Sequence, residues 1–263
     1  MDPWVARIPA ALRAGLPDEL RRLEEIGLNA SATPRQLFYD GWLLRLSPGK
    51  AKRARSVNPF YASTIPLDDK LAACADLFAR AELPLLIRVT PFVSPPDLDD
   101  QLHARGFVAF EDTRVMTVDL TSRPRPASPP HPVAAIDVDA VIAAVSALRS
   151  APQAQVAAHA ERLRGLAQPI QGFVVRDGAA AVCGGLVVTE PPWAGIFDVV
   201  TAEAYRGRGL ASALTTAMLD WAADHGASRA YLQVDADNAA ARAVYGQHGF
   251  VDRYAYWYRR PAT

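Results

Sequence analysis

The chain has 263 residues, of which 50% are hydrophobic, and its 28 basic side chains balance 28 acidic ones. This length is enough for one large domain or for two domains of about 130 residues, each with a proper core. The high apolar content excludes an intrinsically disordered chain. The zero net charge excludes bulk attraction to nucleic acid or to an anionic membrane.

Two cysteines, Cys74 and Cys183, are too few for a disulfide framework and lack the paired spacing of a zinc site. Both lie among small apolar residues, so we expect buried thiols and no metal site. Residues 1–20 carry prolines and charges but no long apolar run, which is not the pattern of a signal peptide or a membrane span. We therefore expect a cytoplasmic protein without a membrane segment.

In chain order, the first half is predicted to form a helix, two strands, a helix, a strand, a helix and a strand. Alternation of Trp42, Leu44 and Leu46 marks the first strand. The predicted elements are residues 17–28, residues 41–47, a strand that ends at 57, and residues 68–81, 85–89, 98–105 and 115–120.

A proline-rich stretch, TSRPRPASPPHP at residues 121–132, follows these elements. Proline lacks the N–H donor that helices and strands use, so the stretch is predicted to be extended. We expect a linker over residues 123–134 between a domain of residues 1–122 and a second domain of residues 135–263.

The second half is predicted to end on the same plan as the first. Asp177-Gly178 is a strong hairpin-turn dipeptide, and Gly226 follows a helix as a left-handed cap. The predicted elements are strands 172–176, 181–189 and 195–200, a helix from 210, strand 230–235, helix 238–247 and strand 254–258. Gly106-Phe107 and Gly249-Phe250 end the last helix of each half, which indicates an internal repeat of two α/β domains.

A glycine-rich turn opens the helix at residue 210 and indicates an anion site. Gly207 and Gly209 let the backbone approach a ligand, and the helix N-terminus adds unpaired N–H donors. Arg206 and Arg208 add positive charge. The turn is therefore predicted to bind a phosphate or a pyrophosphate.

Three other interpretations of this turn are a Walker loop, a dinucleotide-binding turn and a structural bend. A Walker loop requires Gly-Lys-Ser/Thr, and the turn contains no lysine. Gly207, Gly209 and Ser212 nearly match a dinucleotide fingerprint with Asp235 downstream, but the glycines lie deep in the domain. Taken alone, the turn could also be a structural bend with solvated arginines.

Two motifs together resemble the GNAT superfamily of acetyl-CoA-dependent N-acetyltransferases over residues 135–263. The phosphate-loop motif Arg/Gln-x-x-Gly-x-Gly/Ala is filled by Arg206, Gly209 and Ala211. The later motif Asn-x-x-Ala-x-x-x-Tyr-x-x-x-Gly-Phe is filled by Asn238, Ala241, Tyr245, Gly249 and Phe250.

The resemblance implies two tandem α/β domains, each a mostly antiparallel sheet with a splayed parallel pair flanked by helices. It implies transfer of acetyl from acetyl-CoA to a primary amine of a small molecule or peptide, by a monomer or homodimer. A non-catalytic acyl-CoA sensor and, less well supported, a dinucleotide-binding enzyme are the alternatives.

The resemblance also implies a set of residues that hold coenzyme A. Backbone N–H groups of the turn would bind the pyrophosphate, the strand before it would pair with pantetheine, and an amide and an arginine on the later helix would reach the cofactor. These residues are Val199, Val200, Arg206, Gly207, Arg208, Gly209, Leu210, Ala211, Ser212, Asn238 and Arg242.

Acyl transfer to an amine needs an acid and a base. Tyr245 is the predicted acid, because a phenol beside the sulfur can protonate the leaving thiolate. An alkylammonium with a pKa of about 10.4 is only about one part in a thousand nucleophilic at neutral pH. Family members commonly use a carboxylate on the strand before the loop, so Asp198 is the predicted base, followed by Asp235 and Glu190.

The first half lacks the corresponding residues. Counting back from Gly106 places Leu102 where the second half has Tyr245 and Pro95 where it has Asn238. Residues 58–66, which precede a helix, contain neither glycine nor arginine. We therefore expect a degenerate GNAT-like domain that binds no cofactor and supplies one wall of the acceptor cleft.

Overall fold

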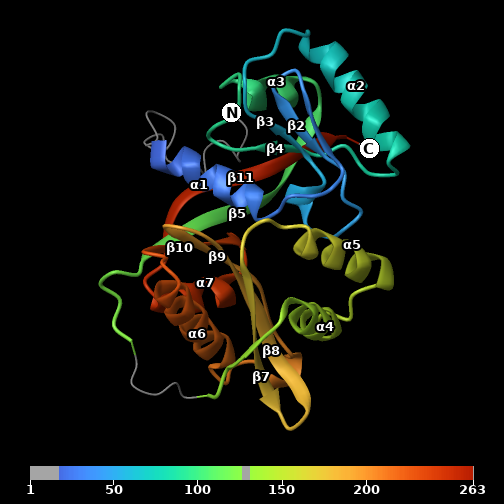
Figure 1. The fold of residues 1–263 in the computed structure, drawn as a ribbon. Coiled ribbons are helices and arrows are strands. Elements are labelled where there is room, and N and C mark those ends of the chain that lie inside the picture. The colour runs from blue at the N-terminus through green and yellow to red at the C-terminus, as the bar shows by residue number, and fades with distance from the viewer. Residues whose placement is uncertain (1–17, 126–130, 263) are drawn as a thin grey trace. The chain divides into compact units, whose positions relative to one another are not determined.

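Two long strands, β5 (Phe107–Asp119) and β11 (Val251–Pro261), each belong partly to one half of the protein and partly to the other (Figure 1). The computed structural model describes residues 18–125 and 131–262. The contacts divide the chain into a first unit, up to Arg114 and again from Tyr254, and a second unit, Val115–Arg253. These divisions fall within β5 and β11, whereas the predicted domains divide at the linker, of which residues 126–130 lie outside the described residues.

The first unit contains a mixed sheet with the strand order β1-β2-β3-β4-β11. Its strands β3 and β4 are parallel and pair at Val57 and Ile87, and the other neighbours are antiparallel. Its elements besides β5 and β11 are α1 (Asp18–Asn29), β1 (Gln36–Tyr39), β2 (Trp42–Arg45), β3 (Val57–Pro59), α2 (Leu67–Arg80), β4 (Ile87–Val89) and α3 (Leu98–Ala104).

The other predicted elements of the first half are present, but the strand predicted to end at residue 57 begins there, because Lys52–Ala54 before it form a short 3-10 helix, and β1 is an additional strand. Leu37 and Phe38 of β1 are both exposed, so the strand lacks the inside–outside alternation by which strands are recognised. Helix α2 packs Leu71, Cys74 and Phe78 into the core, a stripe with the spacing of one helix face.

A buried ion pair ties α1 to β4 within the first unit. The two terminal nitrogens of the Arg88 guanidinium, Nη1 and Nη2, contact the Glu24 carboxylate, and Nη2 lies 3.2 Å from Oε2. The Tyr254 hydroxyl donates to the same Oε2 at 2.7 Å. Glu24 and Arg88 are each 1% exposed. A charge buried to this degree is tolerated only when it is paired, so the unit depends on both partners.

The second unit contains strands in the order β5-β10-β9-β8-β7-β6. Strands β9 and β10 are parallel, as expected for this fold, whereas the pairs β6–β7, β7–β8 and β8–β9 are antiparallel. Its elements besides β5 are β6 (Ala134–Ile136), α4 (Val138–Leu148), α5 (Gln153–Arg164), β7 (Ile170–Asp177), β8 (Ala180–Glu190), β9 (Trp193–Thr201), α6 (Leu210–Asp224), β10 (Arg229–Asp235) and α7 (Ala239–Gln247), together with the start of β11.

Helices α4 and α6 cover opposite faces of this sheet (Figure 1). A Cβ built on Gly184 would lie 3.5 Å from Val145 of α4, and one built on the adjacent Gly185 would lie 3.2 Å from Leu214 of α6. Adjacent residues of a strand point to opposite faces, which agrees with this arrangement. Each face of β8 is therefore covered by a helix.

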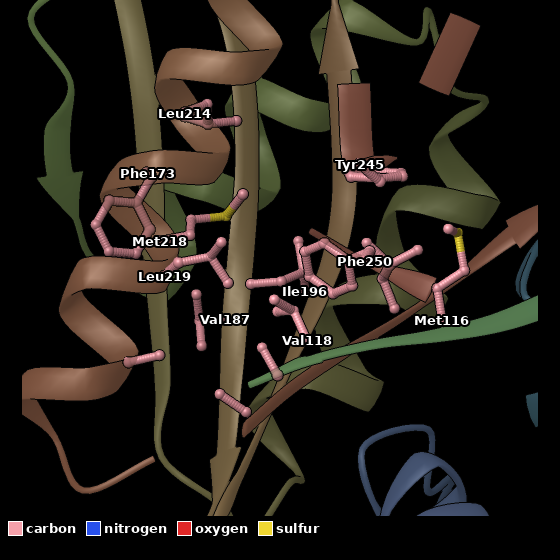
Figure 2. Packing of buried hydrophobic residues seen from close by; sticks show 14 of the residues in the cluster. Met116, Val118, Phe173, Val187, Ile196, Leu214, Met218, Leu219, Tyr245 and Phe250 are labelled. Atoms are coloured by element: carbon pink, nitrogen blue, oxygen red, sulfur yellow. The ribbon is translucent and has the colours of Figure 1, made fainter. Parts of the chain in front are cut away.

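The main core of the second unit lies between α6 and the strands (Figure 2). Leu214 and Met218 of α6 are fully buried and pack toward Val187 and Ile196, which are register partners on β8 and β9. The predicted helix from residue 210 is thereby confirmed, and Gly226 follows it with the expected positive φ of 88°. Both cysteines are buried free thiols, also as expected.

Among the residues that the model describes, no helix is long and apolar enough to cross a bilayer.

We expect Glu24→Ala to lower the free energy of unfolding by about 3–5 kcal/mol, because it leaves the Arg88 charge buried without its partner. Urea unfolding followed by tryptophan fluorescence measures the loss. Glu25→Ala on the same helix is the control, since Glu25 pairs with Arg22 at the surface and the loss should stay below about 0.5 kcal/mol. Equal losses in the two variants would contradict the role given to the buried pair.

Candidate active site

The start of α6 presents open backbone donors. Gly209 is the N-cap residue with a φ of 78°, no side chain caps the helix, and the first helical bond runs from Ala213 N to Gly209 O at 3.0 Å. The preceding N–H groups, those of Leu210, Ala211 and Ser212, consequently have no carbonyl one turn back to bind. Such a set of donors, together with the helix dipole, has the chemistry that suits an anion.

The two glycines of the turn leave the start of α6 without side chains that could cover it. Gly207 and Gly209 have φ values of 75° and 78°, which favour glycine. A Cβ on Gly207 would meet nothing within 4 Å, and one on Gly209 would meet only His131 Nε2 at 3.9 Å. The backbone of the turn is therefore open to a ligand.

A cavity of about 610 Å³ extends from this turn to Tyr245. It contains nine of the eleven predicted cofactor residues and the predicted acid. Its lining is Val199, Val200, Thr201, Tyr205, Arg206, Gly207, Gly209, Leu210, Ala211, Ser212, Asn238, Ala240, Ala241, Val244 and Tyr245. The structure thus brings together residues that lie up to 46 positions apart in the sequence (245 − 199).

Two predicted cofactor residues do not line the cavity. The Arg208 guanidinium lies 4.9 Å from the centre of the Tyr205 ring and donates to Ala204 O at 3.0 Å. Arg242 pairs with Asp252 through two bonds of 3.1 and 3.2 Å. Both arginines therefore have partners in the protein, and their contact with a cofactor stays a prediction.

Strands β9 and β10 separate beside the cavity. Their parallel register runs from Trp193 and Arg229 only to Ile196 and Leu232. Val199 and Val200 lie beyond that register and line the cavity, so a ligand in the cavity would lie along the strand. The early end of this register is the predicted splay.

A β-bulge lies at the same place on the other edge of β9. The register with β8 shifts between the pairs Gly184–Val200 and Leu186–Phe197, so that two β9 residues oppose Gly185. One of these is Asp198, whose φ of 59° is unusual for a residue other than glycine. Bulges and strained residues of this kind are concentrated beside functional sites.

Tyr245 lies on α7 with its ring against Phe250 and is 8% exposed (Figure 2). Burial raises the pKa of its phenol to about 12. Its hydroxyl makes no hydrogen bond within the described part of the chain. A protonated hydroxyl that lines the cavity is a suitable donor to a ligand atom.

Asn238 is the N-cap of α7. Its side-chain oxygen accepts from Ala241 N at 3.1 Å, which stabilises the start of the helix. This bond uses the amide oxygen and leaves the two amide N–H donors for the cavity that Asn238 lines. Asn238 and Tyr245 are thus positioned by one helix, at its first and third turns.

Asp198 is held from two helices that the sequence analysis did not assign to the site. Arg149, which ends α4, donates to Asp198 Oδ1 at 2.7 Å, and His159 Nε2 of α5 lies 2.9 Å from Oδ2. Burial opposes ionisation of this carboxyl, but His159 and Arg149 outweigh burial and bring its pKa far below the usual range. The carboxylate is therefore ionised and weakly basic.

The other two predicted bases lie elsewhere. Asp235 ends β10 and accepts from Asp237 N at 2.9 Å. Glu190 ends β8, where it is the register partner of Trp193 and accepts from Gln168 at 3.2 Å. Trp193 begins β9 and Val199 lies six residues further on, which is roughly 20 Å along a strand. Neither carboxylate is part of the cavity lining, and Asp198 is not part of it either, although it is adjacent to Val199.

The sequence did contain signals for the two missed helices. Asp137 precedes α4 and accepts from Ala140 N at 2.7 Å, a standard N-cap contact, and Pro152 precedes α5. These signals predict helices. They do not predict that Arg149 and His159 reach β9, because that contact depends on how α4 and α5 pack on the sheet.

The residues present fit coenzyme A as a ligand. The open donors at α6 match a pyrophosphate, and the cavity joins them to Val199 and Val200 of β9 and to the Tyr245 side chain. Within residues 18–125 and 131–262, no group of three or more acidic, histidine or cysteine side chains could hold a metal ion.

Comparison with known proteins agrees with this geometry. The family model described as "Probable histone acetyltransferase Rv0428c C-terminal" matches residues 18–259. A relative from Bacillus subtilis (strain 168), described as "Uncharacterized N-acetyltransferase YobR", is 24% identical over 250 residues, which are 92% of this chain and 98% of the relative.

Solved structures show the same fold. A GCN5-related N-acetyltransferase from Kribbella flavida matches with a TM-score of 0.68 at 15% identity, over 95% of this chain and 97% of that chain. A tandem GNAT protein from the clavulanic acid biosynthesis pathway matches with a TM-score of 0.57 at 20% identity, over 74% and 70%. Because the family model spans both units, the protein belongs to the family described as "Probable histone acetyltransferase Rv0428c C-terminal", and it is an acetyltransferase of the GNAT superfamily.

Proposed function

We propose that the second unit transfers an acetyl group from acetyl-CoA to a primary amine of a small molecule or peptide by direct attack. The cavity of about 610 Å³ carries this proposal, because it joins an anion cradle, the strand edge at Val199 and Val200, and a protonated phenol. An anion cradle alone would suit many phosphorylated ligands. The strand edge and the phenol are what a thioester ligand requires in addition.

Each part of the cavity has a separate task in this proposal. The N–H groups at the start of α6 bind the pyrophosphate, while the β9 backbone beyond Ile196 and the Asn238 amide orient the pantetheine arm. Acetyl-CoA supplies the activated acyl group. Tyr245 keeps its proton at Oη through neutral and mildly alkaline pH, because its pKa is about 12, and donates it toward the departing sulfur.

The proposed function is tested by comparing binding with turnover. Coenzyme A should raise the melting temperature, and acetyl-CoA should release thiol with at least one member of a panel of primary amines that includes lysine-containing peptides. The peptides belong in the panel because the family description names histone. Stabilisation without thiol release on any amine would favour a non-catalytic acyl-CoA sensor. Stabilisation by NAD but not by coenzyme A would favour a dinucleotide enzyme.

We expect Gly209→Glu to weaken coenzyme A binding at least about 100-fold, or roughly 2.8 kcal/mol, because it places bulk and negative charge on the cradle. Isothermal titration calorimetry measures the affinity. Gly178→Glu is a matched control, since Gly178 also has a positive φ of 56° and open space at its Cβ but lies in the β7–β8 turn. Unchanged affinity in Gly209→Glu would refute the pyrophosphate assignment.

We expect Tyr245→Phe to lower kcat about 100-fold, the usual scale for loss of a general acid, while the coenzyme A affinity stays within a few-fold. The reason is that the hydroxyl acts on the leaving sulfur and not on the pyrophosphate. Thiol release and calorimetry on the same preparation separate the two effects. The exposed Tyr61 provides the control Tyr61→Phe. If Tyr245→Phe turned over at the wild-type rate, Tyr245 would not be the acid.

A further inference from the structure

Asp198 and Val199 are consecutive residues of β9, and their side chains have contacts on opposite faces of the sheet. Val199 lines the proposed cofactor cavity and would contact a Cβ on Gly185, on the face that α6 covers. Asp198 is held by Arg149 and His159 of the α4–α5 pair, which covers the opposite face. Arg149 and His159 therefore contact β9 from the sheet face opposite to the one that α6 covers.

The Asp198 carboxylate is a poor candidate for taking a proton from an ammonium group. Both of its oxygens are already engaged by cationic or hydrogen-bonding nitrogens, at 2.7 and 2.9 Å. Its strongly lowered pKa agrees with this engagement. A general base must bind a proton at a pH near the working pH. A carboxylate with so low a pKa does not bind one there.

His159 is the neighbouring group with the appropriate chemistry. Histidine is the side chain that changes its charge between about pH 5 and 8. Its Nε2 atom is buried beside Asp198, and its side chain keeps 16% exposure. A carboxylate next to Nε2 favours the tautomer that carries the proton there, which leaves the lone pair on Nδ1.

We propose that His159, held in one tautomer by Asp198, accepts the proton of the acceptor amine at Nδ1. This inference rests on the proposed acetyl transfer and changes the role of Asp198 from base to positioning residue. It also accounts for the left-handed backbone at Asp198, since the bulge places the carboxylate where α5 can be reached.

The proton balance of the step is complete. An N–H bond of the ammonium breaks as an N–H bond to Nδ1 forms, and the neutral amine forms a C–N bond to the acyl carbon as the C–S bond breaks. The sulfur takes a proton from Tyr245 Oη, and the second proton lost by the nitrogen restores the phenol. His159 returns its proton to solvent.

Three charged groups lie around this ring. Asp198 on β9 lies beside Nε2, and Arg149 at the end of α4 and Arg162 on α5 both lower the pKa of the Asp198 carboxyl. The group that accepts the proton and the charged groups around it all belong to the second unit.

The activity test compares two nucleophiles. His159→Gln should lower kcat/KM about 100-fold at pH 7 with the best primary alkylamine of the panel, since an alkylamine is protonated there. It should change kcat/KM less than about threefold with hydroxylamine, which is largely unprotonated and needs no base. The KM for acetyl-CoA should not change. His225→Gln is the matched control, at the far end of α6, roughly 22 Å from the cradle.

Asp198→Asn supplies the second variant, because asparagine tolerates the positive φ. With the alkylamine, it should lower kcat/KM but retain measurable turnover, since the imidazole stays in place and loses only the carboxylate that orients it. A readout independent of activity is the ¹⁵N spectrum of the His159 ring, which should report the Nε2–H tautomer in the wild type and a mixture in Asp198→Asn.

The outcomes separate this inference from the proposed function. If the wild type turns over but His159→Gln keeps alkylamine turnover within about threefold while Asp198→Asn abolishes it, then Asp198 is the base and the inference is wrong. A predominant Nδ1–H tautomer, or equal losses with both nucleophiles, would also overturn it. If the wild type turns over with no amine, the proposed function fails and the inference fails with it.

Discussion

The early end of the pairing between β9 and β10 is the constraint on which the candidate site depends. Parallel strands normally satisfy each other's backbone groups along their whole length, and here the register stops at Ile196 and Leu232. Val199 and Val200 lie beyond that point and line the cavity, where the proposed extended ligand would lie along the strand. The same separation brings the α6 cradle and Tyr245 into one cavity.

The first unit contains the same order of strand, helix and parallel strand without a comparable cradle. Lys70, in the first turn of α2, is buried, contacts the Asp40 carbonyl and the Ser63 hydroxyl, and lies 4.1 Å from the Trp42 ring centre. A cavity of about 250 Å³ remains there. At the start of α2, therefore, the first unit has the ammonium group of Lys70, which already has partners in the protein. At the start of α6, the second unit has open N–H donors instead.

Features that depend on neighbouring residues could be predicted from the sequence, whereas contacts between distant elements could not. The turn at Gly207 and Gly209 follows from local backbone geometry, and the order of two motifs places Tyr245 beside it, so the cavity could be predicted. The partners of Asp198 could not, because Arg149 and His159 reach it through the packing of α4 and α5. The resemblance implies a carboxylate on this strand as the base, and only the tertiary structure shows the two partners of Asp198.

The last described strand has a consequence for how the chain can fold during synthesis. Trp257 and Arg259 of β11 donate to the buried carboxylate of Asp99 at 2.9 and 2.7 Å, so the first unit is completed by residues that are translated after the whole of the second. The second unit, which is continuous in sequence, can form on the ribosome while the first still lacks a strand. The half that is translated first is therefore the half that is finished last.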